Sequence, residues 1–206
     1  PGVAGDVAVN GDHIVAVGDI GRARGRREIN ARGLAVAPGF IDLHAHIEPL
    51  LDIPDAENAV RQGVTTALGG PDGSSPFPLA AYLDSASTAG LGMNVAYLVG
   101  HNTIRRRVMG LAARAPTTAE LKRMQAMVAQ GMADGAFGIS TGLFYLPGTF
   151  AKTDEVVALS KVAADSGGIY TSHLRKEGLG LLEGVGEAIE IGRRAHIPIV
   201  LTHHKV

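Results

Sequence analysis

Histidines in this sequence gather where apolar segments end, and this pattern predicts a metal site. The segment 38–46 reads PGFIDLHAH and carries His44 and His46 two residues apart. Side chains alternate between faces along an extended strand, so both imidazoles point to the same side. Imidazole nitrogen is a common zinc ligand, and two rings on a buried strand are costly without a ligand or a partner. We therefore predict that His44 and His46 bind a metal ion.

Two more histidines follow apolar segments later in the chain. His173 comes directly after 169–172, and His203 directly after 197–202, so four of the eight histidines end such segments. We predict that both are metal ligands. His203 is followed by His204, and only one of two adjacent side chains on a strand points inward. The alternation then turns His204 outward and Lys205 inward, where its ammonium group would meet an anionic part of a substrate.

The elements that must position these histidines alternate short apolar strands with amphipathic helices. This order predicts parallel strands with helices packed outside them. In a barrel of this kind the active site lies at the carboxyl ends of the strands, where the histidines stand. The predicted strands are 34–43, 64–68, 95–99, 136–140, 169–172 and 197–202. A doubly wound open sheet would need a Gly-rich phosphate turn after its first strand, and the sequence has none.

The sequence thus predicts an α/β fold, a partial TIM-type (β/α)8 barrel of about six βα units. Helices are expected from Thr117, where TTAE reads as a capping box, from about Thr153, and from about Leu182 to Ala195. Residues 6–30 contain short β-type runs around the turn Asn10-Gly11-Asp12, which predicts a small antiparallel unit. We expect two domains, a partial β-sandwich over 1–33 and the barrel portion over 34–206.

Composition restricts the class of protein. A content of 46% hydrophobic and 19% charged residues is typical of a globular domain, and a formal net charge of -1 provides no basic field for nucleic acid. No apolar run reaches the length of a membrane span. The chain has no cysteine, which excludes disulfides and thiolate ligands and favours a reducing, cytoplasmic location. We expect a small-molecule partner and neither nucleic acid nor a membrane.

Taken together, the motifs resemble those of the N-acyl-D-amino-acid deacylases, or D-aminoacylases, of the amidohydrolase superfamily. The resemblance covers nearly the whole chain. It rests on the following segments: PGFIDLHAH at 38–46, GVTT at 63–66, LVGHN at 98–102, VMG at 108–110, STGLFY at 140–145, TSHLRKE at 171–177 and HHK at 203–205.

This resemblance implies a fold, a reaction and a ligand set. It implies zinc-dependent hydrolysis of the amide bond of N-acyl-D-amino acids, with one or two zinc ions. His44, His46, His173 and His203 would be zinc ligands, and Lys205 would bind the substrate carboxylate. The family also has a small β-sandwich, to which residues 6–30 would belong.

The sequence departs from the family pattern in two ways. Many of these deacylases have a cysteine ligand after the second strand, where this chain reads GPDGS at 70–74. Asp72 could supply an oxygen ligand there, although an Asp-Gly pair after proline is also an ordinary turn signal. The family's general-base aspartate is expected on the eighth strand, beyond residue 206. We therefore expect the chain to be a segment of a longer protein, with little activity by itself.

Other polar residues after strands are candidates for substrate binding. His101 follows the third predicted strand and would either contact substrate or cap backbone groups in a loop. Tyr145 follows the fourth and would line the pocket or belong to a turn. Arg175 follows the fifth and would bind substrate or pair with Glu177.

Two other functions compete with deacylation. A cyclic-amide hydrolase of the dihydroorotase or hydantoinase kind would have a carboxylated lysine at the end of the fourth strand, but residues 136–140 read AFGIS. A non-catalytic barrel homologue tends to lose its ligand histidines, whereas all four remain here. Both features favour the deacylase interpretation.

Overall fold

The computed structural model describes residues 2 and 4–204 of the 206-residue chain. The chain divides into two compact units, Pro1–Pro38 and Gly39–Val206, and each is described by itself. Among the described residues, no helix is both long enough and apolar enough to cross a membrane.

The first unit contains the predicted antiparallel hairpin. Strand β1 (Asp6–Asn10) pairs with strand β2 (His13–Gly18), with an irregularity in the register after Ala8. Four apolar side chains of the hairpin are 60–68% exposed, namely Val9, Ile14, Val15 and Val17, and Val7 is 37% exposed. A two-stranded hairpin is marginally stable by itself, so these side chains need a further apolar surface to cover them.

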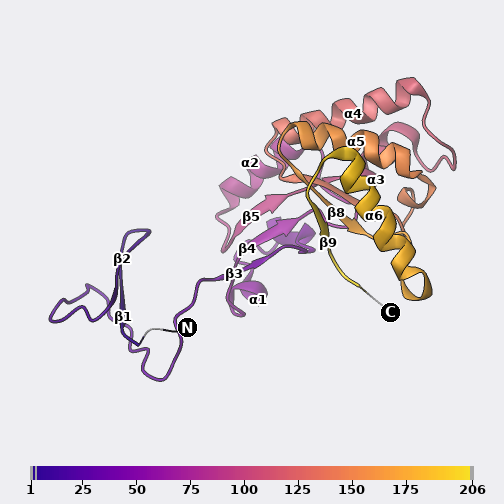
Figure 1. Ribbon diagram of the computed structural model, residues 1–206. Coiled ribbons are helices and arrows are strands. Elements are labelled where there is room, and N and C mark those ends of the chain that lie inside the picture. The colour runs from indigo at the N-terminus through magenta and orange to yellow at the C-terminus, as the bar shows by residue number, and fades with distance from the viewer. Residues whose placement is uncertain (1, 3, 205–206) are drawn as a thin grey trace. The chain divides into compact units, whose positions relative to one another are not determined.

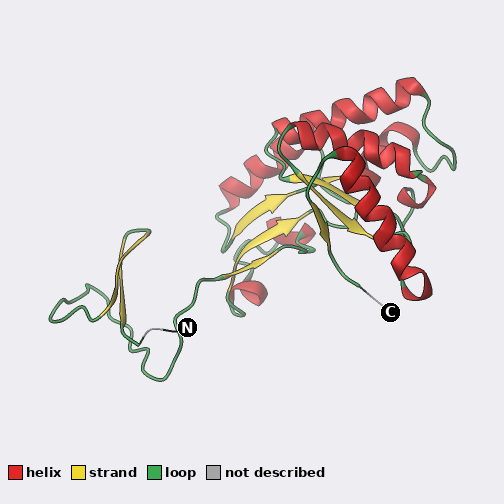
Figure 2. Cartoon of the chain, in the orientation of Figure 1, coloured by secondary structure: helices red, strands yellow, loops and turns green. Residues whose placement is uncertain are grey.

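The second unit alternates strands and helices, as Figures 1 and 2 show. Its strands are β3 (Phe40–Asp42), β4 (Val64–Gly69), β5 (Asn94–Tyr97), β6 (Val99–Gly100), β7 (Gly138–Gly142), β8 (Ile169–His173) and β9 (Ile199–Leu201). Its helices are α1 (Glu57–Val60), α2 (Leu79–Ala89), α3 (His101–Met109), α4 (Thr118–Ala133), α5 (Thr153–Asp165) and α6 (Leu181–Ala195). Short 3-10 helices are η1 (Glu48–Leu51), η2 (Gly148–Phe150) and η3 (Gly178–Gly180).

The strand pairs described for this unit are all parallel, and within each of its two sheets the strands are paired in sequence order. The sheets are β3-β4-β5 and β6-β7-β8-β9. Only Leu98 separates β5 from β6, and its backbone N–H donates to the carbonyl oxygen of Gly69 at 3.0 Å. Consecutive parallel strands place their carboxyl ends at a common edge. Residues that follow the strands are thereby brought together.

Helices cover these strands and form the core. Helix α5 packs against β7 and β8, and α6 packs against β9. Several apolar side chains between the layers are completely buried, including Met124, Val128, Ile139, Val156, Leu159 and Ile191. Burying each such side chain contributes about 1.5–3 kcal/mol, so this layer holds the strand ends firmly.

The predicted helix starts agree with the structure. Helix α4 opens with a complete capping box, in which Glu120 N donates to Thr117 Oγ1 at 3.2 Å and Thr117 N donates to Glu120 Oε2 at 2.8 Å. Helix α5 begins at Thr153 and α6 ends at Ala195, as expected. Capping residues and apolar periodicity were enough to predict these helix ends, because each helix follows a clear turn signal.

The predicted first strand, 34–43, was too long. Pairing begins only where Phe40 N donates to the Gly63 carbonyl oxygen at 2.8 Å, and the strand is Phe40–Asp42. Leu34 and Val36 are 75% and 66% exposed. A strand needs a neighbouring strand to form its ladder, and the apolar pattern alone does not reveal where that neighbour begins.

Candidate metal centre

The four predicted histidine ligands follow three strands at one edge of the sheets. His44 and His46 come just after β3, where the backbone N–H of His44 donates to Asp42 Oδ1 at 2.9 Å. His173 is the last residue of β8, and His203 follows β9 by two residues.

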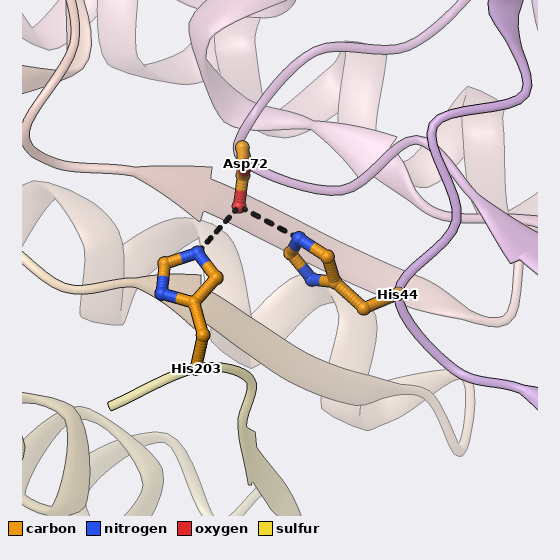
Figure 3. Close-up of side chains that lie close together, drawn as sticks. All are labelled: His44, Asp72 and His203. Atoms are coloured by element: carbon orange, nitrogen blue, oxygen red, sulfur yellow. Dashed lines mark ion pairs between the residues drawn. The ribbon is translucent and has the colours of Figure 1, made fainter. Parts of the chain in front are cut away.

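The four rings converge on Asp72, in the turn after β4. Figure 3 shows His44 and His203 directed at the same carboxylate oxygen. Oδ1 of Asp72 lies 3.5 Å from Nε2 of His44, 3.7 Å from Nδ1 of His173 and 3.8 Å from Nε2 of His203. Nε2 of His46 lies 3.3 Å from Oδ2. One carboxylate is thus surrounded by a nitrogen from every predicted ligand.

One nitrogen each of His44 and His203 and an oxygen of Asp72 lie within 4.8 Å of one another, so these three residues could hold a metal ion. Zinc binds nitrogen and oxygen at about 2.0–2.2 Å, so two ligands of a tetrahedral site stand about 3.4 Å apart. The measured separations of 3.3–3.8 Å lie near that value and exceed the usual hydrogen-bond length. Asp72 Oδ1 is buried and accepts no hydrogen bond from any described residue. A buried, unpartnered carboxylate oxygen among imidazoles is well suited to a cation.

The electrostatics of the centre favour the neutral imidazole that a metal requires. Burial lowers the pKa of His44 below its usual value; the carboxylate of Asp72 opposes this shift and the neighbouring His203 reinforces it. Neutral imidazole is the metal-binding form. His44 is therefore prepared to coordinate without first losing a proton near neutral pH.

The turn that carries Asp72 is held by buried hydrogen bonds. Gly73 N donates to Ser140 Oγ at 3.1 Å, and the Ser140 hydroxyl donates to the Gly70 carbonyl oxygen at 2.6 Å. Asp72 has a positive φ of 54° and Gly73 one of 79°, and a Cβ at Gly73 would stand 2.4 Å from Asn102 Oδ1. Glycine is thus required at 73 for both conformation and space. Aspartate adopts this left-handed conformation more readily than most residues other than glycine, so the turn can present its carboxylate at this point.

A cavity of about 450 Å³ opens over this centre. Its wall includes His44, His46, Asp72 and His203, together with Asn102 and Tyr145. A volume of this size suits a small molecule.

Comparisons with known proteins agree with this geometry. A family profile described as "Amidohydrolase family" matches residues 27–198. The chain belongs to the amidohydrolase family. The expected resemblance to D-aminoacylases is confirmed, since the chain is 37% identical over its whole length to a D-aminoacylase from Alcaligenes xylosoxydans xylosoxydans and 38% identical over 97% of its length to an N-acyl-D-glutamate deacylase from the same organism. It spans about half of these relatives, 48% and 46% of their lengths.

Solved structures give the same family. A crystal structure of D-aminoacylase matches all of the chain and 48% of its own length with a TM-score of 0.93 at 37% identity. A crystal structure of N-acyl-D-glutamate deacylase from Bordetella bronchiseptica, in complex with zinc and a phosphonate inhibitor, matches 96% of the chain and 47% of its own length with a TM-score of 0.90 at 35% identity. The mixed α/β fold with parallel sheets of this amidohydrolase is therefore that of its relatives.

The other predicted site residues of this amidohydrolase have different environments. Tyr145 lines the cavity, and its ring centroid lies 4.5 Å from that of His173. Burial, reinforced by the charges of Asp72 and Glu177, raises the pKa of the Tyr145 hydroxyl, which therefore stays protonated as a hydrogen-bond donor. Lys205 lies outside the described residues.

His101, for which the sequence left open contact with substrate or capping of backbone groups in a loop, is not among the residues that line the cavity. It is completely buried, and its Nδ1 lies 3.1 Å from Asn102 Oδ1 and its Nε2 2.9 Å from Glu155 Oε1. Glu155 also accepts a hydrogen bond from Arg105 at 2.5 Å. Burial raises the pKa of Glu155, but His101 and Arg105 outweigh this effect and hold it below its usual value. His101 thus belongs to a buried charged network, and the neighbouring Asn102 reaches the cavity in its place.

Arg175 pairs with Glu187 on α6 and not with Glu177, the partner suggested by sequence proximity. Its guanidinium makes two hydrogen bonds to Glu187 and one each to the carbonyl oxygens of Thr149 and Ala151. These bonds use four of the five donors of an arginine. The side chain therefore ties the segment after β8 to α6 and to the segment after β7.

Glu177 is the site residue that the sequence did not assign. Its Oε1 lies 3.0 Å from Nδ1 of His203, and its Oε2 lies 3.5 Å from Nε2 of His173. The sequence offered one signal for this role, because Glu177 comes four residues after His173. At that spacing its side chain can lie near His173 only if the chain turns after the strand. Such a turn is present, because η3 begins at the next residue.

Proposed function

We propose that this amidohydrolase carries the metal centre of a zinc-dependent deacylase that hydrolyses the amide bond of N-acyl-D-amino acids. The observation that carries the proposal is the convergence of four imidazoles on one buried carboxylate beside a cavity. The names of the relatives supply the substrate class, because they act on N-acyl-D-amino acids. The substrate is accordingly a small molecule, and neither nucleic acid nor a membrane is required.

The proposed ligands are His44, His46, His173, His203 and Asp72, which hold one or two zinc ions. Zinc supplies Lewis acidity, which polarises a carbonyl group and makes water a nucleophile near neutral pH. One relative of known structure contains zinc, and the metal centre of another is described as binuclear. Oδ1 of Asp72 faces His44 and Oδ2 faces His46. The two oxygens could therefore bind two different zinc ions.

The remaining chemistry belongs to groups around the cavity. We assign Tyr145 as a hydrogen-bond donor to the scissile carbonyl oxygen, because its raised pKa keeps the phenol protonated beside two carboxylates. Lys205 stays our candidate for binding the substrate carboxylate. His101 and Arg175 are not retained as substrate ligands, because both side chains are used in internal hydrogen bonds.

The fold proposal is a partial (β/α)8 barrel over 34–206 with a piece of a β-sandwich over 1–33. Sequential pairing of parallel strands within β3-β4-β5 and within β6-β7-β8-β9 supports the barrel. The exposed apolar side chains of β1 and β2 support a sandwich that other strands would complete. A cytoplasmic location is part of this proposal and is tested by cell fractionation.

Metal analysis tests the proposal directly. The purified protein is loaded with zinc, dialysed and analysed by elemental mass spectrometry beside the double variant His44→Ala/His173→Ala. A matched control is His13→Ala, which alters an exposed histidine of the hairpin. We expect at least one equivalent of zinc in the wild type and in His13→Ala, and a large loss in the double variant. Unchanged zinc content in the double variant would refute the ligand assignment.

Substrate class is tested with matched pairs of N-acetyl-D- and N-acetyl-L-amino acids and with a cyclic amide such as dihydrouracil. In a protein extended to the full length of its relatives, of which this chain spans about half, we expect zinc-dependent release of the free amino acid from the D-series. Preference for the L-series or for the cyclic amide would reject the proposed substrate while leaving the metal centre in place.

A further inference from the structure

Glu177 contacts two of the proposed ligands on the nitrogens that do not face Asp72. His173 turns Nδ1 towards Asp72 and Nε2 towards Glu177, whereas His203 turns Nε2 towards Asp72 and Nδ1 towards Glu177. The ring centroids of these two histidines are 4.4 Å apart, at an angle of 75°. One carboxylate therefore lies beside both rings, with Oε1 3.0 Å from His203 Nδ1, at an angle that does not make a hydrogen bond, and Oε2 3.5 Å from His173 Nε2.

We propose that Glu177 is a positioning residue that fixes the tautomer and orientation of His173 and His203, so that His173 coordinates through Nδ1 and His203 through Nε2. This inference rests on the proposed metal centre. A neutral imidazole carries its proton on one nitrogen only, and the nitrogen beside a carboxylate is the one that keeps it. The opposite nitrogen then presents its lone pair, which here is the nitrogen nearest Asp72.

The backbone before Glu177 is anchored, so that its carboxylate has a defined place. Leu174 is 1% exposed and packs into the core, and Arg175 is fixed by its bonds to Glu187. The Glu177 side chain itself is only 17% exposed. A carboxylate that is largely removed from water needs polar partners in the protein, and the two imidazoles are the groups beside it.

A competing assignment makes Glu177 a metal ligand. Its carboxylate and one nitrogen each of His173 and His203 lie within 4.8 Å of one another, as a metal site requires. In that assignment His173 and His203 would bind the metal through the nitrogens that face Glu177. Asp72 would then share a metal ion with His44 and His46 only. The convergence of all four histidines on Asp72 favours the positioning role.

The test compares Glu177→Ala, Glu177→Gln and the wild type. Zinc affinity is measured by competition with a chromophoric chelator, bound zinc is counted at saturation, and histidine ring ¹⁵N shifts are recorded on the zinc-free protein. Glutamine preserves the shape and one acceptor oxygen, and serves as the second variant should alanine perturb folding. Glu183→Gln is the control, because Glu183 is exposed and its ion pair is with Lys176 and not with a histidine.

We expect Glu177→Ala to bind the same number of zinc ions at saturation with about 10–100-fold weaker affinity, and Glu177→Gln to fall between it and the wild type. The ¹⁵N shifts of His173 and His203 should change from one tautomer to a mixture, whereas Glu183→Gln leaves both readouts unchanged. Unaltered affinity and shifts in Glu177→Ala would overturn the inference, and so would the loss of a whole zinc equivalent at saturation. A wild type that binds no zinc would instead refute the proposed function, and this inference with it.

Discussion

Ser140 on β7 holds the turn that carries Asp72, and its removal has a calculable effect. Its hydroxyl is completely buried, donates to the Gly70 carbonyl oxygen and accepts from Gly73 N. The variant Ser140→Ala leaves both backbone groups without a partner. Each buried group that loses its hydrogen bond costs about 1–3 kcal/mol, so the free energy of unfolding should fall by about 2–6 kcal/mol.

The assay is urea unfolding of the zinc-free protein, followed by circular dichroism. With a urea slope near 2 kcal/mol/M, the midpoint should fall by about 1–3 M. Ser160→Ala is the matched control, because Ser160 on α5 is equally buried but its hydroxyl has no hydrogen-bond partner among the described residues. Its loss should leave the midpoint nearly unchanged. If Ser140→Ala costs no more than Ser160→Ala, the claim that Ser140 holds the Asp72 turn is refuted.

Three further variants test other parts of the account. Glu155→Gln should lower the free energy of unfolding by about 3–5 kcal/mol in the same urea assay, since it leaves the buried charge of Arg105 unpaired; a loss below 1 kcal/mol would contradict this. The hydrogen bond from Arg114 holds the pKa of Glu120 at about 2, below its usual value, so its stabilisation is complete above about pH 4.5 and is lost as the pH falls towards 2. The stability difference between wild type and Glu120→Gln should accordingly shrink over that interval, and a constant difference would disprove the linkage. In a protein extended to the full length of its relatives, Tyr145→Phe should reduce kcat for an N-acyl-D-amino acid by about 10²–10³-fold at unchanged zinc content, and normal turnover would remove Tyr145 from the mechanism.

The placing of the histidines could be predicted because it depends on local rules. The shared edge of parallel strands was enough to bring His44, His46, His173 and His203 together, whereas strand alternation does not apply to His44 and His46, because β3 ends at Asp42. Asp72 became a candidate only because the family that the sequence resembles has a cysteine ligand at that place, and an Asp-Gly pair after proline is also an ordinary turn signal. That these residues bind zinc stays a prediction, since proximity shows only that they are able to.

Partners that lie far away in sequence could not be predicted. His101 meets Glu155, which is 54 residues further along the chain, and Arg175 meets Glu187 on a helix instead of its neighbour Glu177. Such contacts depend on how helices pack on the sheet, which periodicity does not specify. The same limitation explains the error at Leu34, where an apolar pattern has no neighbouring strand to pair with.

X-ray absorption spectroscopy of the zinc-loaded protein tests the central claim most directly. The account predicts nitrogen and oxygen scatterers at about 2.0–2.2 Å with the multiple-scattering signature of at least three imidazoles. Sulfur is absent from the expected shell because the chain has no cysteine. A spectrum with one imidazole or none around the metal would contradict the account.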